Sequence, residues 1–137
     1  MSILKLAAAT LFSLVAATAQ AGELSPEIQA KFLKVIVSSS SVGKIACPDG
    51  PLKAALEAQG VLVDSSSLIV WVTNPNEAKM LKAGGRLVIA GRRDFLQNAC
   101  IVVEEDGGRP KLLLNTANLK AAKVQLSDAV MKIGEKI

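Results

Sequence analysis

Short apolar runs alternate with helical patterns along most of the chain, and this alternation indicates the fold class. Buried strands are predicted at 44–47, 61–63, 68–72 and 86–90, of which 68–72 is the most apolar and is predicted to be central. Helices are predicted between them at Pro51 to Gln59 and Asn74 to Ala83, each followed by glycine. Strands that are apolar on both faces and alternate with helices favour a parallel sheet covered on both faces.

A helix is also predicted ahead of these strands, from Pro26 to Val37. Ser25 is a suitable N-cap, and proline is favoured at the first helical position. The positions predicted to share its inward face are Ile28, Phe32, Val35 and Ile36. The β-branched residues at 35–37 leave open that this segment ends as a strand instead.

The last third of the chain predicts a hairpin and two closing helices. Cys100 to Glu105 and Lys111 to Leu114 flank an Asp-Gly-Gly turn, which favours antiparallel pairing. A short helix at Ala117 to Lys123 follows, and Ser127 begins a closing helix that packs through Val130 and Ile133. The sequence therefore predicts one small three-layer α/β domain, with a mostly parallel sheet, a C-terminal antiparallel hairpin and helices on both faces.

Residues 1–21 have the pattern of a secretory signal peptide. Lys5 is followed by an apolar run from Leu6 to Val15, and Ala19-Gln20-Ala21 fits the small-x-small cleavage motif. The run is too short to span a membrane, so release into the periplasm is favoured over an uncleaved anchor, without membrane insertion after cleavage. The working protein is then expected to be residues 22–137, a single domain.

The composition of this mature chain excludes several function classes. Removal of 21 of the 137 residues leaves 116, and the loss of Lys5 leaves 15 basic against 12 acidic residues, a net charge of about +3. The basic residues are scattered and aromatic residues are few, which argues against nucleic-acid binding. Histidine is absent, so Ser-His-Asp and Cys-His pairs and imidazole metal ligands are excluded. We expect no enzyme activity and no cofactor.

The two cysteines allow more than one interpretation. Cys47 lies at the end of a predicted strand just before a helix, where a helix dipole can activate a thiolate. Alternatively, Cys47 is a small buried residue, or it forms a disulfide with Cys100, as even numbers of cysteines often do in exported proteins. Both cysteines are predicted to lie on strands in separate parts of the sheet. This argues against the disulfide, because cysteine Cα atoms more than about 7 Å apart cannot be joined.

Charged residues and turns at strand ends are the candidate binding positions. Arg92 and Arg93 follow the strand that ends at Ala90, where they can contact a carboxylate, a phosphate or an acidic partner, although a solvated loop is the simpler interpretation. The turn from Pro48 to Pro51 lies at the carboxyl end of another strand. It lacks a phosphate-loop pattern, and the acidic run at 104–106 lacks EF-hand spacing, so no metal site is predicted.

The second half of the chain resembles the end of the YfiR-like periplasmic proteins. The matching features are the hairpin with its Asp-Gly-Gly-Arg turn, Asn115 before a short Ala-rich helix, Val124-Gln125-Leu126-Ser127 and the terminal helix. Gln29 to Leu33, Lys44 to Leu56 and Leu68 to Val72 resemble the family's earlier elements. The chain departs from the family in its serine run after the first helix and in having only two cysteines.

This resemblance implies regulation by protein contact. Well-known members of the family bind the outward-facing part of an inner-membrane diguanylate cyclase and keep it inactive, which lowers cyclic di-GMP. The first hypothesis is therefore an exported regulator that contacts a membrane signalling protein of this kind. The alternative is a periplasmic small-ligand-binding module that uses the crevice between 48–51 and 91–94. A homodimer through strand edges is a further possibility.

Overall fold

The structure, a computed structural model, describes residues 23–137, so the predicted signal peptide lies outside the described residues. None of the helices in 23–137 is long and apolar enough to cross a membrane. The elements, in chain order, are α2 (Pro26–Ser38), β2 (Lys44–Ile45), α3 (Pro51–Ala58), β3 (Leu62–Val63), β4 (Ile69–Trp71), α4 (Pro75–Ala83), β5 (Leu87–Ala90), the 3-10 turn η3 (Arg93–Phe95), β6 (Ile101–Asp106), β7 (Arg109–Leu114), α5 (Thr116–Ala121), α6 (Asp128–Ile133) and β8 (Glu135–Lys136).

The strands form a mixed sheet that is parallel except at one pair. One part has the order β4-β5-β6-β7-β8, and β2 and β3 form a second, two-stranded part. A parallel bridge between Ala46 and Val70 joins the two parts, with hydrogen bonds from Ala46 N to Ile69 O (2.8 Å) and from Trp71 N to Ala46 O (2.9 Å). The continuous order is therefore β3-β2-β4-β5-β6-β7-β8, and only β6 and β7 are antiparallel.

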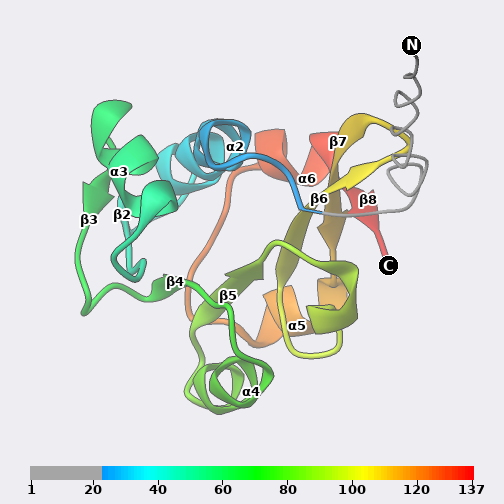
Figure 1. Cartoon of the computed structure of the whole chain (residues 1–137). Helices are drawn as coiled ribbons and strands as arrows, with labels where there is room; N and C mark the ends of the chain where they lie inside the picture. Colours follow the sequence, from blue (N-terminus) through cyan, green and yellow to red (C-terminus); the bar gives the residue numbers. More distant parts are fainter. Residues whose placement is uncertain (1–22) are drawn as a thin grey trace, which may run out of the picture.

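Successive strand residues face opposite sides of the sheet and build two cores. On one side Ile69, Trp71, Leu87 and Ile89 pack against helices α2, α3 and α6. On the other side the alternate residues of the same strands, such as Val70 and Val88, pack against α4 and η3. Figure 1 shows these layers, with α4 across the sheet from α2 and α6. The predicted α/β class, with a mostly parallel sheet, a C-terminal hairpin and helices on both faces, is confirmed.

The helix starts follow from local capping chemistry. The Ser25 hydroxyl accepts a hydrogen bond from Ile28 N at 3.4 Å, and proline occupies an early position of α2. The Asn74 side chain accepts from Asn76 N and Glu77 N at the start of α4. Asn115 caps α5 in the same way, through Asn118 N at 3.0 Å. These caps explain why the sequence pattern places the helix starts within a residue of those observed.

Three details differ from the sequence expectations. Helix α2 continues through Ser38, so the alternative strand at 35–37 is wrong, and its buried residues are Gln29, Ala30, Leu33, Ile36 and Val37. Val35 is exposed, because the buried face is rotated from the predicted one. Ile133 is also exposed, since α6 packs through the buried Val130 and the partly buried Met131. The predicted central strand β4 is an interior strand, but β5 is in the middle of the seven.

Candidate functional site

The strand order reverses between β2 and β4, and this reversal creates a crevice. From β2 the chain passes through α3 on one face of the sheet to β3, whereas from β4 it passes through α4 on the opposite face to β5. The connections therefore diverge from two neighbouring strands. Open α/β sheets usually bind their ligands at such a point, outside the carboxyl ends of the strands.

A cavity of about 220 Å³ lies at this position, and we call it the crevice. It brings together the start of α3, the ends of β4 and β5, and the start of α2, which are separate in the sequence. Its lining residues are Glu23, Pro26, Gln29, Pro51, Leu52, Trp71, Val72, Thr73, Gly91, Arg92 and Phe95. The structure thus brings Pro51 beside Gly91 and Arg92, whereas Cys47 and Pro48 line a neighbouring hollow together with Glu77 and Arg86.

Trp71, Gly91 and Gln29 approach one another closely in the crevice. A Cβ atom added to Gly91 would lie 3.0 Å from the Trp71 ring and 3.0 Å from the Gln29 side-chain nitrogen. Any larger residue at position 91 would therefore require one of these side chains to move. Gly91 does not have a positive φ angle, so space rather than backbone conformation accounts for glycine here.

Gln29 is the functional candidate that the sequence analysis missed. Gln29 is only 5% exposed, and its side chain has no hydrogen-bond partner within residues 23–137. A buried amide without a partner costs free energy, so an unsatisfied amide in a cavity is unusual. The sequence does carry a signal, because Gln29 lies four residues before Leu33 and seven before Ile36, on the buried face of α2.

The start of α3 supplies polar backbone groups beside this amide. Its N-cap is Gly50, which has no side chain, and Pro51 has no N–H. Since Ala54 N bonds to Gly50 O at 3.1 Å, the N–H groups of Leu52 and Lys53 are the ones without a side-chain cap. Asp49 does not cap them either, since its carboxylate pairs with Lys53 at 2.8 Å. That pairing lowers the pKa of Asp49. Pro51 and Leu52 of this first turn line the crevice, where helix N-termini favour negative charge.

The two candidate arginines have different surroundings. Arg92 lies at the crevice, where Asp94 accepts from its Nε (3.1 Å) and from a terminal nitrogen (2.5 Å), and its guanidinium lies 5.5 Å from the centre of the Phe95 ring. Arg93 instead donates to Glu104 and Asp106 of the hairpin. Both arginines already have carboxylate partners, and their role as partner or anion contacts stays a prediction.

Cys47 and Cys100 are free thiols in this structure. The residue before Cys47 bridges to Val70, Val70 pairs with Val88, and Cys100 N bonds to Val88 O, so three strand spacings, about 14 Å, separate their positions. This separation exceeds the span of a disulfide. Burial raises the pKa of Cys47 to about 11 and also raises the pKa of Cys100, so neither thiol is activated as a nucleophile.

The acidic run of the hairpin takes part in ion pairs. Asp106 lies 3.2 Å from Lys111 and 3.4 Å from Arg93, and Lys111 also pairs with Glu135 of β8 at 3.0 Å. Within residues 23–137, no group of three cysteine, aspartate or glutamate side chains is placed to hold a metal ion. Glu104 and Asp106 therefore join the hairpin to η3, and Lys111 joins it to β8.

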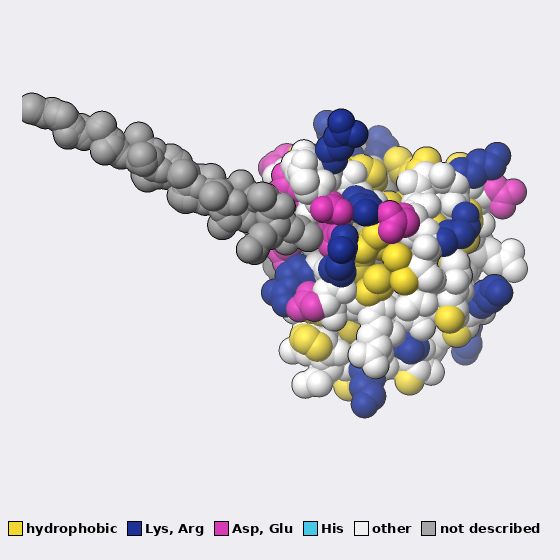
Figure 2. Space-filling model, turned by 90° about the vertical axis from the view of Figure 1, so that its right-hand side faces the viewer, with side chains coloured by type: hydrophobic (Ala, Val, Ile, Leu, Met, Phe, Trp, Pro, Cys, Tyr) yellow, Lys and Arg dark blue, Asp and Glu magenta, His cyan; other side chains and the backbone are white. Residues whose placement is uncertain are grey.

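A second, larger hollow lies at the C-terminal end of the chain. It has a volume of about 610 Å³ and is lined by Thr116, Leu119, Lys120, Ala122, Val124, Gln125, Leu126, Met131 and Lys136. Ile133 lines a separate hollow of about 330 Å³ next to Glu135 of β8, and Ile137 directly follows β8; these two residues are 55% and 59% exposed. We call the larger hollow together with Ile133 and Ile137 the C-terminal surface. Figure 2, which views the molecule from the right-hand side of Figure 1, where β7 and β8 lie, shows a group of apolar side chains among charged ones on that side.

Comparisons with known proteins define the fold but not the function. No model of a protein family and no curated protein sequence matches this chain. A similar solved structure is the crystal structure of a conserved domain protein from Vibrio cholerae O1 biovar El Tor str. N16961, with a TM-score of 0.55 and 11% sequence identity over 82% of this chain. The chain spans 60% of that protein's length. At this level of identity the likeness shows a shared fold alone.

Proposed function

We propose that this chain is an exported regulatory protein of the YfiR-like kind, which acts by contact with a membrane signalling protein rather than by catalysis. The sequence resemblance supports this proposal, and it is concentrated in the hairpin, the Ala-rich helix and the terminal helix. The partner expected from the resemblance is an inner-membrane diguanylate cyclase, which the bound regulator would keep inactive. Export through the signal peptide at 1–21 is part of the same proposal.

The observation that carries the proposal is the C-terminal surface. Leu119, Val124 and Met131 give the hollow an apolar lining, and Lys120 and Lys136 are its charged lining residues. Apolar patches with a polar rim are typical of protein-binding sites. The absence of acidic lining residues favours a partner segment that combines apolar and acidic side chains.

The edge of the sheet adds to this surface. Strand β8 pairs with β7 on one side, and within residues 23–137 no strand covers its other side. An uncovered edge strand can accept a strand from another protein. Ile133 and Ile137, which lie just before and just after β8 in the sequence, are exposed apolar side chains that a partner strand could contact.

Site-specific cross-linking in intact cells tests the proposal. A photo-reactive residue at Ile133 is expected to capture an inner-membrane protein with a cytoplasmic signalling domain, identified by mass spectrometry. The matched control is Met80, an apolar residue of α4 that is 73% exposed on the opposite face of the sheet. Capture of a second copy of this chain from position 133 would instead indicate a homodimer, and no capture from position 133 would reject the proposal.

Substitutions then connect the contact to signalling. Ile133→Asp and Lys120→Glu are expected to weaken co-purification of the membrane protein and to raise cellular cyclic di-GMP, because they disrupt the apolar and basic parts of the surface. Met80→Asp and Lys79→Glu make the same chemical changes on α4, and we expect them to have no effect. Equal effects of both pairs would contradict a contact through the C-terminal surface.

A further inference from the structure

We propose that the crevice binds a small molecule with a carboxylate group and an apolar body. This binding site is separate from the C-terminal surface, so the inference does not depend on the proposed partner contact. The crevice holds an unpartnered buried amide, an uncapped helix start and an aromatic ring around one cavity. Each of these features specifies a different part of the ligand.

The negative group is specified by Gln29 and α3. The Gln29 side-chain nitrogen has two N–H groups with no acceptor in residues 23–137, and a carboxylate oxygen is a strong acceptor for them. The N–H groups of Leu52 and Lys53 in the first turn of α3 lack a side-chain cap, and the helix dipole favours an anion there. An anion held between these groups satisfies donors from two helices at once.

Arg92 does not supply the main attraction. Its guanidinium is paired with Asp94, and the crevice also contains Glu23, whose charge acts on Arg92. Since these carboxylates offset the arginine, the ligand charge must be held by neutral donors. This arrangement favours a singly charged carboxylate over a phosphate, because a more highly charged group would need an unpaired cation.

The apolar body is specified by Trp71 and its neighbours. The Trp71 ring lies against Gly91, and Leu52, Val72 and Phe95 complete the apolar lining. A volume of about 220 Å³ is below the range of about 300 to 1,000 Å³ typical of drug-sized ligands, so the ligand is smaller. Small branched or aromatic carboxylic acids have the matching size and chemistry.

The chain carries its own probe of this site, because Trp71 is its only tryptophan and tyrosine is absent. We would titrate the purified mature protein with acetate, isobutyrate and benzoate and follow the fluorescence of Trp71. Saturable changes are expected, with an affinity that rises from acetate to benzoate. The matching neutral amides are expected to bind about tenfold more weakly, since they lose the charge-assisted hydrogen bonds.

Variants locate the binding. Gly91→Ala places a methyl group against Trp71 and Gln29 and is expected to weaken benzoate binding about tenfold or more, whereas Gly84→Ala, whose new methyl group has room at 3.5 Å, leaves it unchanged. Gln29→Leu is expected to weaken benzoate about tenfold without affecting benzamide as strongly. No saturable response of folded wild-type protein to any of the three acids, or equal binding of acids and amides, would overturn the proposal.

Discussion

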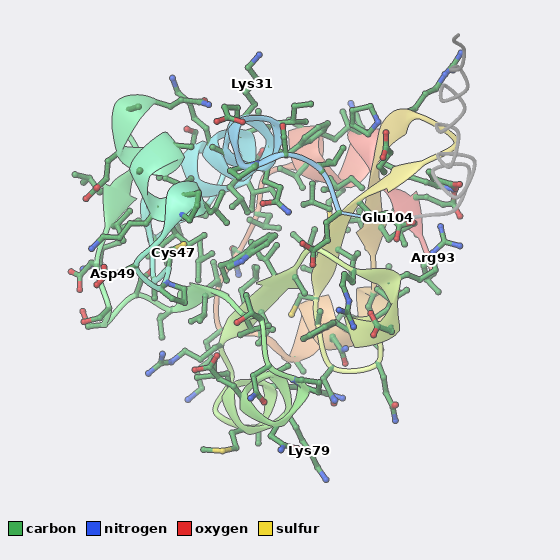
Figure 3. The ribbon with its side chains drawn as sticks, in the orientation of Figure 1. Lys31, Cys47, Asp49, Lys79, Arg93 and Glu104 are labelled. Carbon is green, nitrogen blue, oxygen red and sulfur yellow. The ribbon has the colours of Figure 1, made fainter. Side chains whose placement is uncertain are left out.

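Arg93, in the 3-10 turn after β5, holds its guanidinium against the carboxylate of Glu104, which is 1% exposed on β6. The Arg93 Nε donates to Glu104 Oε2 at 3.0 Å, and a terminal nitrogen donates to the same oxygen. Figure 3 shows the two side chains together, far across the molecule from Cys47. The pair attaches the turn that carries Arg92 to the hairpin, so it fixes one wall of the crevice.

Removal of Arg93 alone is expected to destabilise the protein. Arg93→Met leaves the Glu104 carboxylate buried without its main partner, which is costlier than the loss of a surface ion pair. We expect the melting temperature to fall by about 5 to 10 °C in thermal denaturation followed by circular dichroism. The double variant Arg93→Met with Glu104→Leu is expected to recover most of this loss. A double variant that melts lower than Arg93→Met would contradict this account.

A buried asparagine of α5 bonds to the segment that leads into β6. Asn118, 7% exposed, donates from its side chain to Gln97 O (3.0 Å) and Ala99 O (2.9 Å). Asn118→Ala leaves these carbonyls without the donor, and we expect it to lower the free energy of unfolding by about 1 to 3 kcal/mol in urea. Asn76→Ala, at an exposed position of α4, is the control. If the free energy of unfolding of Asn118→Ala is less than about 0.5 kcal/mol below that of the wild type, water replaces the amide, and this account is contradicted.

The helix starts and the apolar strands are predictable from sequence because they depend on neighbouring residues. Ser25 and Asn74 cap helices through N–H groups two or three residues away, and β5 is a run of four buried residues. Of the predicted inward face of α2, only Val35 is wrong: Ile36 is buried and Ile28 and Phe32 pack partly against the core. Apolar residues at 28, 32, 35, 36 and 37 allow more than one inward face. Strand β8 has only two exposed residues and gives no apolar signal.

The crevice is only partly predictable from the sequence, because its lining segments are far apart in the chain and are brought together by the order of the strands in the sheet. The rule that ligands bind at the carboxyl ends of parallel strands pointed to the segments around Pro51 and Gly91. It could not identify Gln29, whose importance depends on lying beside Gly91, 62 residues later in the chain. The pairing of Arg93 with Glu104 likewise depends on where the 3-10 turn packs against β6, which no local pattern encodes.

Asp64 is expected to make the stability sensitive to acid. Its carboxylate accepts from Ser66 N (2.9 Å), Ser66 Oγ (2.7 Å) and Lys44 Nζ (3.0 Å), and these bonds, those from Ser66 first, lower its pKa from 3.8 to about 2. A pKa that folding lowers contributes stability above about pH 3.8, and this contribution is lost as the pH falls toward 2.

We therefore expect the melting temperature of the wild type to fall more steeply between pH 4 and 2 than that of Asp64→Asn. Lys44→Met, which removes the lesser cause of the shift, is expected to keep most of the wild-type slope. The comparison uses thermal denaturation at matched ionic strength. Identical slopes for wild type and Asp64→Asn would show that the Ser66 bonds do not persist in solution.

The two thiols are expected to be unreactive in the folded protein and free in the unfolded one. Burial raises the pKa of Cys47 to about 11, so at pH 8 only a small fraction is thiolate, and its alkylation by iodoacetamide should be much slower than that of glutathione. Cys100 is buried and its thiol donates to Asn118 O at 3.4 Å, so its alkylation should require unfolding.

Mass spectrometry after labelling distinguishes this state from the alternatives. In denaturant, both cysteines are expected to take up the label in the purified protein without any reductant. Labelling that needs a reductant would instead demonstrate a disulfide, which would require the strands carrying the two cysteines to be rearranged, because three strand spacings separate them here. Rapid labelling of Cys47 in the folded protein at pH 7 would indicate an activated thiolate and would reopen thiol catalysis as a function.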